Sequence, residues 1–363
     1  MSLFMNLPDK MKAVVVYGPK DYRLEERPVP KIGREEVLVK VLATGICASD
    51  VKTYYGHRVW GSEDIPPYIQ TPVIPGHEFI GEVVALGEGA KEKHGIDIGD
   101  WAIAEQIIPC GKCRFCKEGK YWMCQQHDIF GFIKDRAEGS WAEYMKYPAN
   151  SIIHKVPYSI KPEYAATIEP LACAIHAVER ANIQLNDVVV IAGMGPIGLF
   201  MLQIAKMKGP GLLIAIDLKQ NRLEIAKNLG ADIVINPLEE DVVKKVLDLT
   251  EGYGCDVYIE ASGSKSAVIQ GLKMIRKLGT FVEFGVHAEP TCVDWSIIGD
   301  VKELNIYGAH LGPFCYPKAI RYLEEGKVKV DSIVTHILPL QNFQEGIELV
   351  HNGENSIKII LKP

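Results

Sequence analysis

The pattern of apolar and polar residues changes character near Glu163. Before that residue, short apolar runs are separated by clusters of glycine and proline, and strands at such spacing are typical of a small barrel or sandwich. The first part of the chain is therefore expected to be rich in strands and loops. Its expected strands are Ala13–Tyr17, Val37–Leu42, Phe79–Leu86 and Trp101–Ala104.

From Glu163 onward, apolar runs of strand length alternate with longer segments whose apolar residues recur at helical spacing. Strands that are apolar on both faces and are separated by helices form parallel sheets. This part is therefore predicted to be an α/β domain with a doubly wound, six-stranded parallel sheet. The expected strands are Val188–Ala192, Leu212–Asp217, Ile233–Ile235, Asp256–Glu260, Thr280–Phe284 and Leu304–Gly308. The expected helices are Gly198–Lys208, Asn221–Leu229, Glu239–Thr250 and Ser264–Leu278.

The end of the chain predicts two helices and a strand, at Tyr316–Glu325, Asn342–Val350 and Ile357–Leu361. These elements are too few for a separate domain, so we expect them to pack on the first one. The predicted organisation is a first domain at residues 1–162, a second at 163–308 and a return segment at 309–363 that completes the first.

Composition narrows the classes of function. The 363 residues are 47% hydrophobic and 24% charged, with a net charge of −6, as in ordinary globular proteins. A mildly acidic chain lacks the excess of positive charge with which proteins bind nucleic acid or an anionic membrane. No run approaches the roughly 20 apolar residues of a membrane-spanning helix. Residues 1–11 contain no apolar signal core, so a cytoplasmic location is expected.

Nine cysteines, an odd number in a chain of this size, argue against a disulfide framework and favour metal or redox chemistry. Four of them lie within 15 residues, and four thiolates at this spacing suit a closed, tetrahedral zinc site. An iron–sulfur cluster and a nucleic-acid-binding zinc ribbon are the chemical alternatives. The four are Cys110, Cys113, Cys116 and Cys124. The basic residues beside them are Lys112, Arg114, Lys117 and Lys120.

A glycine-rich turn, G-x-G-x-x-G, follows the expected strand Val188–Ala192 and opens a helix. In that context the first glycine makes the turn, the second admits a pyrophosphate, and the third permits close helix–strand packing. An acidic residue at the end of the next strand hydrogen-bonds a ribose 2′-hydroxyl, which favours NAD over NADP, although a nearby arginine softens that preference. A cofactor-free strand–helix turn is the alternative. The residues predicted to bind the dinucleotide are Gly193, Gly195, Pro196, Ile197, Gly198, Asp217 and Arg222.

A second, dispersed set offers sulfur, nitrogen and oxygen ligands: Cys47, the pair His77-Glu78, and Glu169. A catalytic zinc with an exchangeable position uses such a mixed set. Each residue also has an ordinary explanation, since a single cysteine packs in a core and a His-Glu pair forms loop hydrogen bonds.

The order of these features resembles the zinc-dependent medium-chain dehydrogenases. The resemblance covers essentially the whole chain and rests on Gly76-His77-Glu78, the four-cysteine lobe, Gly139–Tyr144, Glu169-Pro170-Leu171 and Gly193–Gly198. It implies a GroES-like catalytic domain, discontinuous in sequence and carrying a structural zinc lobe at about 105–128, with a Rossmann domain inserted. It also implies two zinc ions per subunit, NAD, and a homotetramer.

The resemblance further implies roles for single residues. Cys47, His77, Glu78 and Glu169 would surround the catalytic zinc, with the carboxylates exchanging with water rather than binding at once. Ser49 would relay the substrate proton, and Asp50 would orient His77, as expected behind a metal-bound imidazole. Lys52 stands where several relatives carry histidine, so the outer end of the proton path departs from the family pattern.

Within the family, three segments resemble the erythritol/L-threitol dehydrogenases: Asp21–Glu26, Trp295–Ile298 and Gly308–Pro313. The stretch between Cys47 and His77 is longer than in sorbitol dehydrogenases, and long loops are often functional lids. The candidate substrate residues are Tyr54, Tyr55, Trp60 and His310, with His57 and Arg58 beside them.

These features predict NAD-dependent oxidation of a secondary hydroxyl in a small polyol, with erythritol or L-threitol giving a ketose such as erythrulose as the best match. Zinc would act as a Lewis acid on the substrate oxygen. The backbone near Val286 would approach the nicotinamide. The alternatives are a threonine 3-dehydrogenase, a sorbitol or other polyol dehydrogenase, and, outside the enzymes, a zinc-containing nucleic-acid-binding protein or an NAD sensor.

Overall fold

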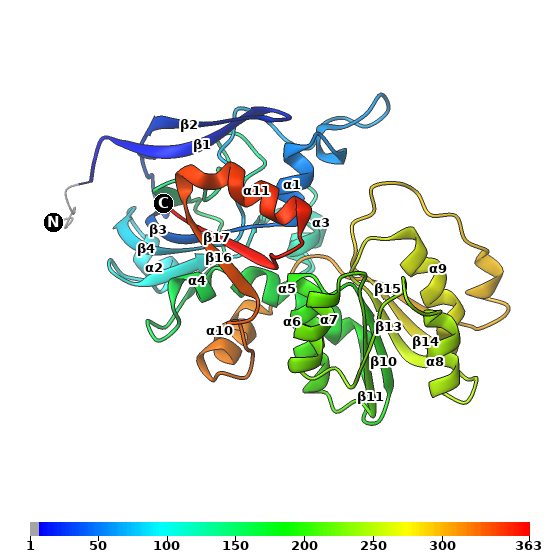
Figure 1. Cartoon of the computed structure of the whole chain (residues 1–363). Helices are drawn as coiled ribbons and strands as arrows, with labels where there is room; N and C mark the ends of the chain where they lie inside the picture. Colours follow the sequence, from blue (N-terminus) through cyan, green and yellow to red (C-terminus); the bar gives the residue numbers. More distant parts are fainter. Residues whose placement is uncertain (1–6) are drawn as a thin grey trace. The chain divides into compact units, whose positions relative to one another are not determined.

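A computed structural model describes residues 7–363, which form two compact units (Figure 1). Unit 1 combines the chain up to Glu169 with Tyr316–Pro363, and unit 2 is Pro170–Cys315. The boundary between Glu169 and Pro170 lies near the start of helix α5 (Ile168–Ala181). Unit 1 is thus discontinuous in sequence, and unit 2 is inserted in it.

Unit 1 is built on a seven-stranded sheet with the strand order β16-β17-β3-β4-β5-β9, in which β8 also pairs with β3. The C-terminal segment supplies two of these strands, because β17 pairs antiparallel with β3 and parallel with β16. The strands are β3 (Val37–Ile46), β4 (Phe79–Leu86), β5 (Trp101–Ala104), β8 (Tyr144–Tyr147), β9 (Ile153–Lys155), β16 (Val334–Pro339) and β17 (Lys358–Lys362).

Two antiparallel strand pairs and several short helices complete unit 1. The pairs are β1 (Lys10–Gly18) with β2 (Asp21–Pro28), and β6 (Ile107–Ile108) with β7 (Asp128–Ile129). The helices are α1 (Ala48–Tyr54), α2 (Ala90–His94), α3 (Arg114–Lys117), α4 (Pro162–Ala165), α10 (Tyr316–Glu324) and α11 (Phe343–Asn352). The 3-10 turns are η1 (Arg58–Trp60), η2 (Tyr121–Met123) and η4 (Leu340–Asn342).

The sequence pattern missed six strands of unit 1: the short strands β6, β7, β8 and β9, and the longer strands β2 and β16. Strand β2 has charged residues at most positions, and only Tyr22 in it is buried, so it lacks an apolar run. Strand β16 alternates half-buried and exposed positions, with Thr335 and His336 among them. Both are held by pairing with a neighbour rather than by their own hydrophobicity.

Unit 2 contains the predicted parallel sheet of six strands, in the order β12-β11-β10-β13-β14-β15 (Figure 1). This order reverses direction beside the first strand, β10, as in doubly wound dinucleotide-binding folds. The strands are β10 (Val188–Ala192), β11 (Leu212–Ile216), β12 (Ile233–Ile235), β13 (Cys255–Glu260), β14 (Ile275–Glu283) and β15 (Asn305–Gly308). The other elements are α6 (Pro196–Lys206), α7 (Gln220–Asn228), α8 (Val242–Leu249), α9 (Lys265–Met274) and η3 (Trp295–Ile297).

Two predicted helix boundaries in unit 2 were wrong. Helix α8 begins later than expected because the Asp241 side chain accepts hydrogen bonds from the backbone N–H groups of Val243 and Lys244, which makes it the N-cap. Helix α9 ends at Met274, and the residues expected to extend it begin strand β14, where Ile275 pairs with Cys255. The pairing partner, which lies 20 residues away in the chain, decided that boundary.

Candidate functional site

Cys47, His77 and Glu78 meet at the ends of the paired strands β3 and β4. Cys47 follows β3 and caps helix α1, and the other two residues directly precede β4. The antiparallel pairing of Thr44 with Phe79 brings these ends together. One ligand atom from each of the three residues lies within 4.8 Å of the others. His77 and Glu78 are buried, and Cys47 is half-buried.

Asp50 stands behind the imidazole. Its Oδ1 lies 3.6 Å from His77 Nδ1, while its Oδ2 accepts a 2.9 Å hydrogen bond from the Cys47 backbone. His77 Nδ1 is buried with no hydrogen-bond partner among residues 7–363, and Asp50 Oδ1 is the carboxylate oxygen facing it. A proton on Nδ1 directed at Asp50 would leave the Nε2 lone pair free for a metal.

The electrostatics of this cluster suit a cation. Burial alone would lower the pKa of His77, but Asp50, Cys47 and Glu169 outweigh it and hold that pKa well above its usual value. A site with this much negative charge and with thiol, imidazole and carboxylate donors fits zinc. Ser49 Oγ lies 3.4 Å from His77 Nε2, on the side of the ring away from Asp50, so a hydroxyl faces the proposed metal position.

A buried lysine that the sequence did not indicate holds Glu78. Lys358 Nζ, from β17, donates to both Glu78 oxygens, at 2.7 Å for Oε1, and to the Ile46 carbonyl at 3.0 Å. Both side chains are at most 2% exposed. Gly45 permits this approach, because a Cβ there would lie 2.0 Å from Glu78 Oε2. The Glu78 carboxylate is therefore shared between the lysine and the metal position.

Glu169 is a buried neighbour of the cluster, since its charge acts on both His77 and Lys358. Gln106 Nε2 donates to Glu169 Oε1, and the Tyr316 hydroxyl donates to Gln106 Oε1 at 2.6 Å. The adjacent Glu105 accepts from the Tyr121 hydroxyl at 2.8 Å. Sequence reasoning missed Gln106 and Tyr316 as supports of Glu169, because they are distant from it in the chain.

The four cysteines of the predicted metal lobe converge in unit 1, with all four sulfurs within 4.8 Å of one another. Backbone N–H groups of Gln125 and Cys116 lower the pKa of Cys113 to about 6. Burial and the neighbouring Cys113 and Cys124 raise the pKa of Cys116 to about 12, although a backbone N–H of Gly111 opposes them. A divalent cation would relieve the repulsion between such thiolates, so the lobe fits a structural zinc.

Two of the four basic residues beside the lobe are paired with a single carboxylate. Arg114 and Lys120 both pair with Glu118, at 2.7 and 3.0 Å. Both side chains are more than half exposed, as expected for solvated charges.

In unit 2, a different steric feature explains why glycine occupies each of the three glycine positions of the predicted turn. Gly193 has φ +97°, and a Cβ there would lie 2.8 Å from Ser262 Cα. A Cβ on Gly198 would lie 1.8 Å from the Gly193 carbonyl oxygen. A Cβ on Gly195 would meet only Arg222 Nη1, at 4.0 Å, so the space beside this backbone is open. Pro196 and Ile197 begin helix α6, so its N-terminus faces that space, as a pyrophosphate site requires.

Asp217 directly follows β11 and lies beside this turn. Its Oδ2 accepts a hydrogen bond from Met194 N at 2.7 Å, and Oδ1 accepts one from Lys219 N at 2.9 Å. Arg222 Nη1 lies 3.8 Å from Asp217 Oδ2, and Arg222 Nε is buried without a hydrogen-bond partner in the described chain. The carboxylate is thus fixed beside the glycine-rich turn, with an arginine next to it. Val286, further along in unit 2, is 66% exposed.

The four candidate substrate residues are not gathered within one unit. In unit 1, the Tyr55 hydroxyl donates to Glu348 at 2.8 Å, and its ring lies 4.3 Å from that of His351. Trp60 Nε1 donates to the Thr53 carbonyl at 2.8 Å, and Tyr54 packs edge-on against Tyr22. His310 is an exposed residue of unit 2. Their contacts within unit 1 tie the expected lid residues to helices α1 and α11.

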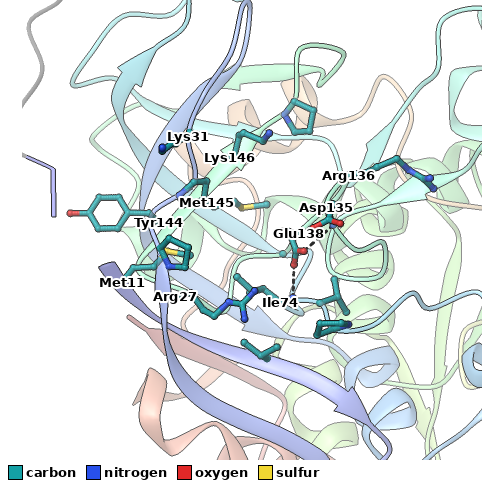
Figure 2. A pocket seen from close by; sticks show the side chains of 17 residues that line it. Met11, Arg27, Lys31, Ile74, Asp135, Arg136, Glu138, Tyr144, Met145 and Lys146 are labelled. Atoms are coloured by element: carbon teal, nitrogen blue, oxygen red, sulfur yellow. Dashed lines mark hydrogen bonds between the residues drawn. The ribbon is translucent and has the colours of Figure 1, made fainter. Parts of the chain in front are cut away.

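A cavity of about 220 Å³ in unit 1 contains none of the predicted site residues (Figure 2). Its half-buried carboxylate, Glu138, accepts hydrogen bonds from the backbone of Ile74 at 2.6 Å and of Asp135 at 3.0 Å. Burial raises the pKa of Glu138. This carboxylate is satisfied by backbone groups and thereby ties two loops together.

Four cysteines lie outside both clusters. Cys173, Cys255 and Cys315 are buried, as residues that pack in a core are, and Cys292 is exposed. No cysteine in residues 7–363 forms a disulfide. Within the same range, no helix combines the length and apolar character needed to cross a membrane.

The chain is similar to known proteins over nearly its whole length. Residues 33–158 match the family model of the alcohol dehydrogenase GroES-like domain, and residues 196–325 match that of zinc-binding dehydrogenases. The chain is 52% identical to the erythritol/L-threitol dehydrogenase of Mycolicibacterium smegmatis, over 98% of this chain and 99% of that protein. It is 40% identical to the L-threonine 3-dehydrogenase of Pyrococcus horikoshii, over 96% and 97%. A crystal structure of an Escherichia coli CFT073 alcohol dehydrogenase complexed with NADH has a TM-score of 0.87 at 29% identity, covering 98% of this chain and 100% of that one.

Proposed function

The chain belongs to the zinc-dependent medium-chain dehydrogenases, and from that premise we propose that it oxidises a secondary hydroxyl of a small polyol, such as erythritol or L-threitol, to a ketone. It is an NAD-dependent oxidoreductase of the zinc alcohol and polyol type. The observation that carries the proposal is the buried Cys47–His77–Glu78 cluster with Asp50 behind the imidazole. Its carboxylate in place of a second cysteine matches the polyol branch of the family.

Each residue of the site has a role that follows from its contacts. Cys47 and His77 would hold zinc, with Glu78 and Glu169 as exchangeable carboxylates and Asp50 fixing the imidazole. Zinc held there would supply Lewis acidity at the substrate hydroxyl, and NAD would supply the hydride acceptor. Ser49 Oγ, 3.4 Å from His77 Nε2, would relay the proton that leaves the substrate hydroxyl, accepting it while its own proton passes on toward solvent. In unit 2, Gly193–Gly198 and Asp217 hold the dinucleotide, and Cys110, Cys113, Cys116 and Cys124 hold the structural zinc of unit 1.

The substrate class is tested by steady-state reduction of NAD on a panel of four- to six-carbon polyols and threonine, with and without a zinc chelator. Erythritol or L-threitol is expected to give the highest kcat/KM, and chelation is expected to abolish turnover. Activity on threonine alone would overturn the polyol assignment and would keep the zinc mechanism, because the same metal chemistry serves both alcohols.

The choice between NAD and NADP depends on Asp217. The Asp217→Ala variant is expected to lose affinity for NAD and to gain affinity for NADP, because the carboxylate that repels a 2′-phosphate is removed while Arg222 stays beside it. We expect the ratio of kcat/KM for the two cofactors to move by about two orders of magnitude, as a charge-assisted hydrogen bond of about 1.5–3 kcal/mol is exchanged. An unchanged ratio would remove Asp217 from the ribose site.

The proposal includes a homo-oligomer, a tetramer by analogy with the family. Strand β15 is the edge of the unit 2 sheet, and its Ile306 and Tyr307 are 41% and 38% exposed. An apolar sheet edge of this kind pairs readily with a second copy of itself. Ile306→Lys is therefore expected to reduce the mass measured by sedimentation velocity by at least half. Val301→Lys, on an exposed residue before that strand, is the matched control and should leave the mass unchanged.

The redox state of the cysteines indicates a cellular compartment. None of the nine cysteines, all of which lie in residues 7–363, forms a disulfide; this suits a reducing compartment, and we therefore propose a cytoplasmic location.

A further inference from the structure

A carboxylate outside both proposed zinc sites is fully buried at the end of β13. Glu260 is 0% exposed and accepts hydrogen bonds from three groups of the loop that follows it. These donors are Ser262 N at 2.9 Å, the Ser262 hydroxyl, and Gly263 N at 3.1 Å to Oε1 and 3.0 Å to Oε2. A buried carboxylate surrounded by loop N–H groups fixes the loop, since each donor would be unsatisfied without it.

Two further side chains complete what we call the Glu260 cluster, which is Glu260, Glu283 and His287. His287 Nε2 lies 3.0 Å from Glu283 Oε1 and 3.7 Å from Glu260 Oε2. Glu283 ends β14, and His287 is in the loop after it. Burial and the neighbouring Glu260 raise the pKa of Glu283 to about 7, against the opposing effect of His287. The cluster therefore joins the loop after β13 to the loop after β14.

The loop after β13 packs at contact distance on the dinucleotide turn, and the loop after β14 packs on the loop after β13. A Cβ on Gly193, the first glycine of the turn, would lie 2.8 Å from Ser262 Cα. A Cβ on Gly263 would lie 2.7 Å from the Val286 carbonyl oxygen, and one on Gly285 would lie 2.1 Å from Glu260 Oε2. A displacement of Glu260 would therefore move the backbone that touches the turn.

We infer that Glu260 and His287 are positioning residues for the cofactor site: they join the loop at 285–287 to the loop at 261–263, hold the latter against the Gly193 turn, and thereby set the affinity for NAD. The carboxyl ends of β13 and β14 lie on the edge of the sheet where doubly wound folds bind their ligands. Loops already fixed in position lose little conformational entropy when the cofactor binds. This inference rests on the proposed use of NAD, and it assigns to the Glu260 cluster a part in binding rather than in the chemical step.

The test compares His287→Ala and Glu260→Gln with the wild-type enzyme in steady-state kinetics and in direct titration with NAD. For both variants, KM and the dissociation constant for NAD are expected to rise about tenfold, with kcat within about twofold of wild type. His287→Gln places an amide N–H near the position of Nε2 and should restore most of the affinity. Glu289→Gln, on an exposed residue that pairs with Lys265, is the matched control and should change neither constant.

The outcomes separate the inference from the proposed function. Wild-type protein that fails to bind NAD would overturn the function itself. Wild-type protein that binds NAD, with unchanged affinity in His287→Ala, would overturn the inference alone. Equal losses of kcat and kcat/KM in the variants would also overturn it, because they indicate an effect on the chemical step. His287→Ala keeps the conclusion testable even if Glu260→Gln fails to fold, because His287 is partly exposed.

Discussion

Replacing Cys47 by serine is expected to reduce kcat by about three orders of magnitude while leaving the affinity for NAD unchanged. Loss of the thiolate removes a ligand of the proposed catalytic zinc, and Lewis-acid catalysis contributes several kcal/mol to such reactions. The dinucleotide turn lies in unit 2, separate in sequence and in core from Cys47. Steady-state kinetics measure kcat, titration with NAD measures the affinity for the cofactor, and metal analysis measures the zinc content.

The zinc content of the Cys47→Ser variant tests the role of Cys47 most directly. Wild-type protein is expected to hold two zinc ions per chain and the Cys47→Ser variant one, because the four-cysteine lobe is a separate cluster. Cys292→Ser is the matched control, since Cys292 is an exposed thiol in unit 2. Full activity in Cys47→Ser, or loss of activity in Cys292→Ser, would contradict the assignment of the catalytic metal.

Lys358→Met is expected to destabilise unit 1 by about 3 kcal/mol, because removal of one partner from a buried ion pair leaves an uncompensated charge. The charge left behind is that of Glu78, which is 1% exposed and bonded by the lysine through both oxygens. Lys362→Met is the matched control on the same strand. Lys362 pairs with Glu163 at 3.3 Å with its side chain 45% exposed, and such pairs contribute about 0–1 kcal/mol.

Chemical unfolding followed by tryptophan fluorescence measures this difference, since four of the five tryptophans lie in unit 1. The double variant Lys358→Met/Glu78→Gln is expected to recover a large part of the lost stability, as both charges are then absent. Two single variants whose effects simply add would contradict the pairing. The Lys358–Glu78 pair also affects the zinc site, because a carboxylate that is paired with a lysine is a weaker zinc ligand than an unpaired carboxylate.

Residues adjacent in the chain were predictable because their geometry is local. The spacing of Cys110, Cys113, Cys116 and Cys124 permits few arrangements other than one shared ion, and their sulfurs do converge. The same holds for Gly193–Gly198, where the strand before and the helix after fix the turn. The parallel sheet followed from apolar runs alternating with helical segments, because such strands must be buried on both faces.

The dispersed site was predictable only as a set of candidates. Cys47 and His77 are 30 residues apart, and their spacing alone does not bring their side chains together. The resemblance to a known family supplied that step, and the pairing of β3 with β4 supplies the physical cause. The roles of Ser49, Asp50 and Glu169 follow from the family pattern, and the structure adds the contacts on which those roles depend.

By itself, the sequence determined the elements with strong local signals: the six-stranded parallel sheet, the glycine-rich turn and the four-cysteine lobe. Only the tertiary structure decided which distant side chains support the site. Lys358 meets Glu78 across 280 positions, Tyr316 meets Gln106 across 210, and His287 joins Glu260 across 27. Hydrophobic periodicity specifies which face of an element is buried. It does not specify which partner a buried charge will find, because strand pairing and packing bring that partner from elsewhere in the chain.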